Sequence, residues 1–314
     1  MKALRWAAVC LLATAPVAAT GCNKVFLLSR EDEIALGEKY GPELEAEYGG
    51  RVDNERVQGY VRSIGRRLAT VAERDMPYQF ALLRSHTPNA FAVPGGRIYV
   101  TVGLFRDMTN ERQLAAVLAH EIGHIVHRDS AKGLQRQLGV ELLAAIVGDA
   151  LGGSGGTAAK TAAKVVGGLV NLKYSRDQEY AADMAGLEHM VGVGYNPWGM
   201  VELLRLLESE KEAGTLGEML STHPLTSKRI EEVEQAIRDQ YPAFSPDQPD
   251  PHAARFADVR DIVRQLPPPP PKPDATQAAS DPDGQAEATG DGETRPRAPR
   301  DGQPPPVIRI PDVE

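Results

Sequence analysis

The strongest chemical signal in the chain comes from three residues, His120, Glu121 and His124. A spacing of four residues places both imidazoles on one face of a helix, one turn apart. Two imidazoles so placed can bind one zinc ion at about 2.0–2.1 Å each. Glu121 stands next to the first histidine, where its carboxylate could act as general base towards a water molecule at the metal. The pattern therefore predicts the active site of a zinc peptidase.

The flanking residues separate this interpretation from that of a polar patch on an ordinary helix. They leave almost no polar face, so the helix is expected to be buried: Ala115, Ala116, Val117, Leu118, Ala119, Ile122, Ile125 and Val126. Buried imidazoles and a buried carboxylate are costly unless they are paired or bound to a metal, which favours a metal site. His127 is expected to end the helix and interact with its dipole, because Arg128 and Asp129 indicate exposure.

A catalytic zinc ion usually takes three protein ligands and leaves one position for water. One known extension places a third histidine six residues after the second, with a glycine between them. This chain has His127 and Ser130 at those positions, which excludes the extension. The alternative is a glutamate from a second helix, and the best candidate is Glu179. Asp183 follows one turn later and could accept a hydrogen bond from the far nitrogen of a ligating histidine. The competing interpretation is a solvated acidic helix in which Glu179 pairs with Arg176.

Four segments of the chain resemble metallopeptidase family forty-eight, the HtpX-like and CaaX prenyl protease type. They occur in the order of the family and together cover roughly residues 31–241: residues 85–100, 120–124, 179–183 and 221–230. The resemblance implies an α+β fold, a mainly helical zincin of the gluzincin type with a small β-sheet or hairpin beside the cleft. It also implies endopeptidase activity and one zinc ion per chain.

The resemblance assigns roles to individual residues. It implies that His120, His124 and Glu179 are the zinc ligands and that Glu121 is the general base. It also brings in His223, which the family places at the active site. His223 would either stabilise the oxyanion or occupy the open position on zinc in a resting state. From the residues alone, His223 is only a turn residue before Pro224.

The elements that must position these groups are predicted from periodicity. Residues 31–70 contain two helical apolar series divided by a pair of glycines. Residues 78–84 and 90–93 have the pattern of strands, and a Pro-Gly-Gly turn leads into a returning strand at 97–101.

By resemblance, this hairpin borders the cleft. An extended substrate could then add to the sheet beside Asn89, Ala90 and Phe91 through main-chain hydrogen bonds, a mode that selects unfolded chains. A plain structural hairpin is the alternative.

A stretch rich in glycine and alanine, residues 148–168, lies between the two predicted metal-binding helices. No apolar run there reaches the ~18 residues that a membrane-spanning helix needs. The stretch is either a hairpin of mobile helices that forms a lid over the cleft or a passive linker.

The N-terminal region has the features of an export signal. Residues 1–21 begin with two basic residues and continue with an apolar stretch too short to span a bilayer as a mature helix. The Gly21–Cys22 pair resembles the bacterial lipoprotein signal, which predicts lipidation of Cys22 and a tether over residues 22–30. Asn23 then favours the outer membrane, with the protein facing the periplasm. The alternative is an ordinary secretory signal cut near Ala18.

Cysteine usage agrees with this organisation. The chain has two cysteines, Cys10 within the signal and Cys22 at its end. The mature protein would therefore have neither a disulfide nor a cysteine ligand to zinc.

The zinc peptidase domain is predicted over residues 31–243, followed by a proline-rich and largely disordered tail over 244–314. Within this tail, an amphipathic segment around Phe256, Val259 and Val263 could dock on the enzyme. The formal net charge of −8, with both signs interspersed, offers no basic stripe for nucleic acid.

The predicted function is zinc-dependent proteolysis of unfolded or misassembled envelope proteins. One rival is a non-proteolytic chaperone or assembly factor for outer-membrane proteins with a silent zinc site, which the intact His120, Glu121 and His124 oppose. A second rival is an integral-membrane prenyl-protein protease, which the absence of a sufficiently long apolar run opposes.

Overall fold

The computed structural model describes residues 28–152, 158–214 and 217–268. The predicted signal, Cys22 and the tail beyond residue 268 lie outside the described residues.

A small sheet lies at the centre of the described chain. Its strands are β1 (Gln79–Leu83), β2 (Ala90–Val93) and β3 (Arg97–Thr101), in the order β1-β3-β2. β1 runs parallel to β3, and β2 pairs antiparallel with it, as the predicted hairpin requires. The turn between β2 and β3 uses Gly95 and Gly96, whose φ values of 92° and 96° favour glycine. The three predicted strands are confirmed.

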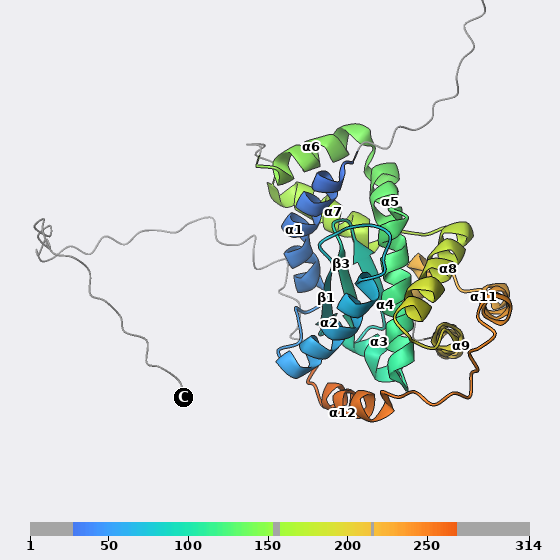
Figure 1. Ribbon diagram of the computed structural model, residues 1–314. Helices are drawn as coiled ribbons and strands as arrows, with labels where there is room; N and C mark the ends of the chain where they lie inside the picture. Colours follow the sequence, from blue (N-terminus) through green and yellow to red (C-terminus); the bar gives the residue numbers. More distant parts are fainter. Residues whose placement is uncertain (1–27, 153–157, 215–216, 269–314) are drawn as a thin grey trace, which may run out of the picture. The chain divides into compact units, whose positions relative to one another are not determined.

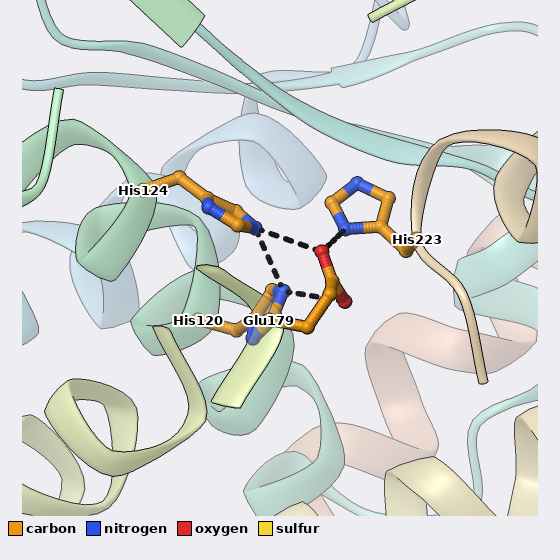
Figure 2. Close-up of side chains that lie close together, drawn as sticks. All are labelled: His120, His124, Glu179 and His223. Atoms are coloured by element: carbon orange, nitrogen blue, oxygen red, sulfur yellow. Dashed lines mark hydrogen bonds and ion pairs between the residues drawn. The ribbon is translucent and has the colours of Figure 1, made fainter. Parts of the chain in front are cut away.

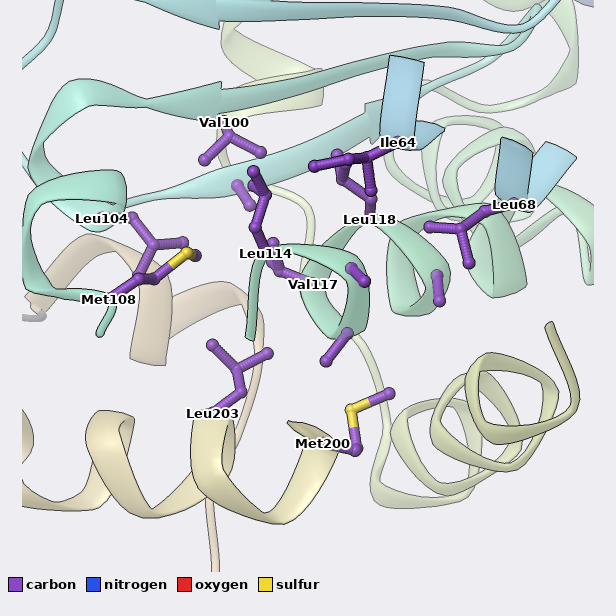
Figure 3. Close-up of a cluster of buried hydrophobic side chains, with 14 of the residues drawn as sticks. Ile64, Leu68, Val100, Leu104, Met108, Leu114, Val117, Leu118, Met200 and Leu203 are labelled. Carbon is purple, nitrogen blue, oxygen red and sulfur yellow. The ribbon is translucent and has the colours of Figure 1, made fainter. Parts of the chain in front are cut away.

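Helices cover both faces of the sheet (Figure 1). Alternate side chains of each strand point to opposite sides and join one of two hydrophobic cores. One face packs against α1 (Arg30–Glu47), through side chains such as Leu83, Val93 and Tyr99. The other face packs against α2 (Glu55–Ala69) and α4 (Glu111–Val126). Figure 3 shows this second core, where side chains of α2, β3 and α4 meet those of α9 (Trp198–Ala213). The fold class predicted from the sequence, mainly helical α+β with a small sheet, is confirmed.

Helix α4 carries the motif and is the most enclosed element of the fold. Asn110 caps its first turn, His127 is its C-cap as expected, and every residue from Leu114 to Ile125 is buried. α3 (Val102–Asp107) precedes α4, and α8 (Arg176–Gly192) packs along it. This contact is close because a Cβ on Gly123 would lie 2.8 Å from the carbonyl oxygen of Ala182.

The glycine-rich stretch between these two helices is helical where it is described, except for a turn at residues 151–152. α5 (Asp129–Leu138) leads into α6 (Val140–Ala150) and α7 (Ala158–Val170), and residues 153–157 lie outside the described residues. α6 and α7 both pack against α1 and α5. Their buried apolar residues join the core on the α1 side of the sheet.

The chain continues through α10 (Gly217–Thr222) and α11 (Ser227–Gln240) to α12 (Ala253–Arg264). α12 buries Phe256, Val259 and Val263 against α2 and α3, so the amphipathic segment expected to dock does so. Packed structure thus continues beyond residue 243, where the predicted domain ends. Among the described helices, none has both the length and the apolar composition to cross a membrane.

Candidate metal centre and active site

Four buried side chains converge between α4, α8 and the end of α10 (Figure 2). The Nε2 atoms of His120 and His124 lie 3.1 Å apart. Glu179 places Oε1 3.3 Å from Nε2 of His124 and Oε2 3.7 Å from Nε2 of His120. His223 donates from Nδ1 to Oε1 of Glu179 at 3.0 Å. One ligand atom from each residue lies within 4.8 Å of the others, an arrangement that could hold a metal ion.

The outer nitrogens of the two histidines are held by carboxylates. Nδ1 of His120 lies 2.9 Å from Oδ1 of Asp183, and Nδ1 of His124 lies 3.0 Å from Oδ2 of Asp129. An Nδ1–H that donates to a carboxylate leaves Nε2 as the free lone pair and orients the ring. The structure therefore places Asp183 where the sequence analysis positioned it, beside a candidate ligand.

Asp129 is a residue that the sequence analysis missed. Its charge beside His127 predicts an exposed position, but its exposed fraction is 3%. It begins α5, and its second oxygen accepts a hydrogen bond from Gln178 at 2.6 Å. The expectation of exposure was wrong because it treated the end of α4 as a surface, whereas α8 covers it.

Arg229 of α11 is the second residue that the sequence analysis left without a role. Its Nε and Nη2 donate to the two oxygens of Asp183 at 2.5 and 2.7 Å, and its Nη1 donates to Oε2 of Glu179. The alternative of a solvated Glu179 paired with Arg176 is wrong, because Glu179 is fully buried and Arg176 is exposed. A buried guanidinium against two carboxylates gives this network a fixed geometry.

The electrostatics of the cluster favour a positive charge on His124 and a negative charge on Glu179. Burial alone would lower the pKa of His124, but its hydrogen bonds with Asp129 and Glu179 raise the pKa to about 10. Burial dominates at His120 and lowers its pKa. Burial would favour the neutral form of Glu179, yet the charges of His223 and Arg229 hold its pKa well below the ordinary value. The cluster therefore contains an ionised carboxylate, Glu179, next to two imidazoles, in surroundings that favour positive charge.

Glu121, unlike Glu179, receives no hydrogen bond from the described residues. It is completely buried, and among the described residues no group hydrogen-bonds to either of its carboxylate oxygens. Its Oε1 lies 3.8 Å from Nε2 of His223. A buried carboxylate without a hydrogen bond is costly, which argues for a partner that a bound metal and its water would supply. Two imidazoles and a carboxylate are also a common donor set of catalytic zinc, so the residues present fit this ion.

A recess beside the cluster is lined in part by residues of β2. It is lined by Tyr48, Asn89, Phe91, Ala92, Leu169, Val170, Leu172, Tyr174, Thr222 and His223. The ring of Tyr174 stacks on His124 with centroids 4.0 Å apart. Leu169 and Val170 come from the end of α7 and directly follow the stretch predicted as lid or linker, residues 148–168.

The three residues predicted to bind substrate lie at different depths. Asn89 and Phe91 line the recess, whereas Ala90 is fully buried and pairs with Val100 of β3. β2 is an edge strand, and the bond from Thr101 N–H to the Asn89 carbonyl directs the main-chain groups of Ala90 and Ala92 away from β3. The hydroxyl of Ser130 already donates to the Ala92 carbonyl at 2.8 Å. A strand adding to this edge would have to displace that contact.

Comparison with known proteins identifies the family. A family profile described as Peptidase family M48 matches residues 55–237, more than half of the chain and a range that contains the whole cluster. The chain belongs to peptidase family M48. The resemblance found in the sequence is thereby confirmed, and with it the class of metallopeptidase.

Individual relatives agree with the family. The chain is 30% identical over 225 residues to the beta-barrel assembly-enhancing protease of Yersinia pestis. The matched region covers 68% of this chain and 46% of that protein. The Escherichia coli (strain K12) protein of the same name is 28% identical over 223 residues, with the same two shares. The mitochondrial metalloendopeptidase OMA1 of Schizosaccharomyces pombe is 31% identical over 218 residues, 66% of this chain and 62% of that protein. The chain thus spans about half the length of the bacterial relatives.

Proposed function

We propose that the protein is a zinc-dependent endopeptidase that holds one zinc ion per chain through His120, His124 and Glu179. The observation that carries the proposal is the buried convergence of these ligand atoms within 4.8 Å, with a carboxylate hydrogen-bonded to the outer nitrogen of each histidine. Asp183 and Asp129 orient the imidazoles, and Arg229 balances the charge of Glu179 and Asp183.

The chemistry follows from the position of Glu121. When bound, zinc polarises the peptide carbonyl and lowers the pKa of a water molecule. Glu121 accepts the proton of the attacking water and delivers it to the leaving amine. Its lack of a hydrogen-bond partner among the described residues leaves both oxygens available for this transfer.

The test separates metal binding from proton transfer. We expect Glu121→Gln to retain zinc and to lose proteolysis of an unfolded, casein-type substrate by about 10²–10⁴-fold. The control is Glu188→Gln, the same change at an exposed position of α8. Zinc content is measured by elemental analysis on both variants and on the unaltered protein. Unaltered protein without zinc would contradict the metal assignment, and an active Glu121→Gln variant would contradict the role of Glu121.

His223 has two candidate roles in this proposal. If it donates a hydrogen bond to the oxyanion, His223→Ala should lower kcat by roughly 10²–10³. If it occupies the open position on the metal at rest, the same change should raise basal proteolysis. The two roles differ in the sign of the rate change at saturating zinc, and an unchanged rate would contradict both.

We propose that the substrates are unfolded or misassembled proteins of the bacterial envelope. Two relatives are named beta-barrel assembly-enhancing protease, and the edge strand β2 could accept an extended chain near Asn89, Ala90 and Phe91. The same names support a second candidate, a non-proteolytic assembly factor. Complementation with Glu121→Gln distinguishes them, because an assembly factor would keep its function in the cell without the general base.

The proposed organisation places this enzyme on a membrane. Residues 1–21 are a lipoprotein signal, Cys22 carries the lipid at the head of a tether that leads towards α1, and the protein faces the periplasm from the outer membrane. The peptidase domain begins near residue 31 and includes α12, beyond the boundary at residue 243 expected from the sequence, and a proline-rich segment follows it. Cys22→Ser should release the protein from the membrane. Mass spectrometry that finds an unmodified N-terminus at another residue would contradict the anchoring.

A further inference from the structure

We infer that Glu33 and Arg128 position His124, because the ion pair between Arg128 and the buried Glu33 holds a left-handed turn that presents Asp129 to the imidazole. The inference rests on the proposed metal centre and adds to it two residues that lie outside the cluster. Neither residue belongs to the four that could hold the metal, so both act through Asp129.

The backbone of Arg128 is the first observation. Its φ of 61° and ψ of 30° lie in the left-handed region, and among the described residues it is the one non-glycine with positive φ. It stands at the junction between α4, which ends at Val126, and α5, which begins at Asp129. A side chain with a Cβ disfavours this conformation, and glycine is the usual choice. An arginine at this position therefore indicates that its side chain stabilises the turn.

The contacts of that side chain are the second observation. Glu33 of α1 is 1% exposed, and its Oε1 accepts from Nε of Arg128 at 2.8 Å and lies 2.6 Å from Nη2. Arg128 Nη2 also donates to the carbonyl of Leu28. The same carboxylate accepts from Arg74 at 2.9 and 3.0 Å, and Arg74 donates to the carbonyl of Ile125 in the last turn of α4. Glu33 thus ties both sides of the junction to α1.

The turn brings Asp129 back onto the helix that precedes it. Asp129 lies five residues after His124, and its Oδ2 is 3.0 Å from Nδ1 of that ring. Its Oδ1 accepts from Gln178, the neighbour of Glu179. One aspartate therefore connects a candidate ligand on α4 with the start of α8. If the junction relaxed to a right-handed conformation, Asp129 would leave both partners.

The experiment uses substitutions that separate backbone from side chain. Arg128→Ala loses the ion pair and keeps the unfavourable turn, whereas Arg128→Gly loses the ion pair but adopts the turn freely. Glu33→Gln removes the charge that holds Arg128, and Glu38→Gln, at an exposed position of α1, is the matched control. For each full-length variant we would measure the zinc dissociation constant by chelator competition and the absorption spectrum of the cobalt-substituted protein, which reports ligand geometry.

We expect Arg128→Ala and Glu33→Gln to weaken zinc binding by about 10–100-fold and to alter the cobalt spectrum, the effect of losing a hydrogen-bond partner of a ligand. Arg128→Gly should stay within about threefold of the unaltered protein, because its turn needs no side chain. Glu33→Gln should then weaken zinc binding less in the Arg128→Gly background than in the unaltered protein, because the arginine that Glu33 holds is already absent.

Equal losses in Arg128→Ala and Arg128→Gly would overturn the inference, since the backbone conformation would then be irrelevant. Zinc binding and cobalt spectra unchanged in Arg128→Ala and Glu33→Gln would also overturn it. If Arg128→Ala does not fold, the comparison of Glu33→Gln with the double variant decides. Failure of the unaltered protein to bind zinc would contradict the proposed function itself and is thereby distinguished.

Discussion

At the residue scale, the side chains behind the candidate ligands matter as much as the ligands. Asp183 accepts from His120 and from Arg229, and both of its oxygens are occupied. The pKa of Asp183 is lowered because Arg229 and His120 outweigh its burial. It is therefore ionised throughout the neutral range and can hold His120 in a single tautomer.

Removal of Asp183 is expected to weaken the metal centre without removing a ligand. Asp183→Ala should reduce zinc affinity by about 10–100-fold, because the ring of His120 loses its partner and Arg229 loses two hydrogen bonds. Chelator competition measures the change. Asp177→Ala, an exposed aspartate on the same helix, is the control. Zinc affinity equal to that of the control would contradict the role of Asp183.

Asp107 provides a test of pH dependence at a single residue. Burial and the nearby Glu210 raise its pKa to about 6, against the opposing charge of Arg106. Because the folded protein binds this proton more tightly than the unfolded chain, the carboxyl group destabilises the fold increasingly as pH rises from about 4 to about 6. Asp107 is also the last residue of α3, where a negative charge opposes the helix dipole.

Asp107→Asn should therefore stabilise the protein above pH 6 and have little effect at pH 4. After allowance for solvent screening, we expect about 1 kcal/mol, or roughly 2–4 °C in Tm. Thermal denaturation at pH 4 and pH 8 measures it, with Asp261→Asn as the control at an exposed site. A gain of the same size at both pH values would show that charge is not the cause.

At the element scale, the site depends on how closely α4 and α8 approach. Each helix supplies part of the cluster, His120 and His124 from α4 and Glu179 from α8. The approach is possible because Gly123 faces the backbone of Ala182. A wider separation would move Glu179 away from both histidines.

Gly123→Ala should therefore destabilise the fold and weaken zinc binding together. A Cβ there would lie 2.8 Å from a carbonyl oxygen that belongs to backbone, so we expect a loss of about 1–3 kcal/mol from overpacking. Gly148→Ala is the control, because a Cβ in that helix meets nothing within 4 Å. Denaturant unfolding and zinc competition measure the two effects. Gly123→Ala with the stability of the control would contradict the close-contact argument.

At the scale of the whole molecule, α12 supplies side chains that complete the hydrophobic core. Phe256 stacks on Phe105 of α3 with ring centroids 5.5 Å apart. Arg106 donates to the carbonyls of Val263, Arg264 and Leu266 at 3.2, 3.2 and 2.8 Å. The peptidase fold thus uses residues beyond 243 that belong to the proline-rich region by composition.

Truncation after residue 268 should leave Tm close to that of the full chain, whereas truncation after residue 243 should lower it strongly. The shorter chain loses the burial of Phe256, Val259 and Val263, worth about 1.5–3 kcal/mol each. Thermal denaturation of the three chains tests this. Equal stability of the two truncated chains would show that α12 is dispensable.

Much of the fold and site is local enough to be predicted from the sequence. The spacing of His120 and His124 decides that they share a helix face, and periodicity defines the strands and most helices. Glu179 and Asp183 could be paired by the same one-turn rule. Ala90 shows the limit of such reasoning. The strand pattern predicts a residue beside the substrate, but it does not reveal that Ala90 is completely buried.

Only the tertiary structure decided which distant groups serve the site. Asp129 looked exposed because the left-handed turn at Arg128, and the Glu33 that holds it from α1, leave no pattern in nearby residues. Arg229 lies 46 residues after Asp183, and no periodicity links α11 to α8. The sequence by itself determined that His120 and His124 share one face of a helix, since that depends on helix geometry alone. Their orientation depends on ion pairs between helices, which exist only once the core has brought those helices together.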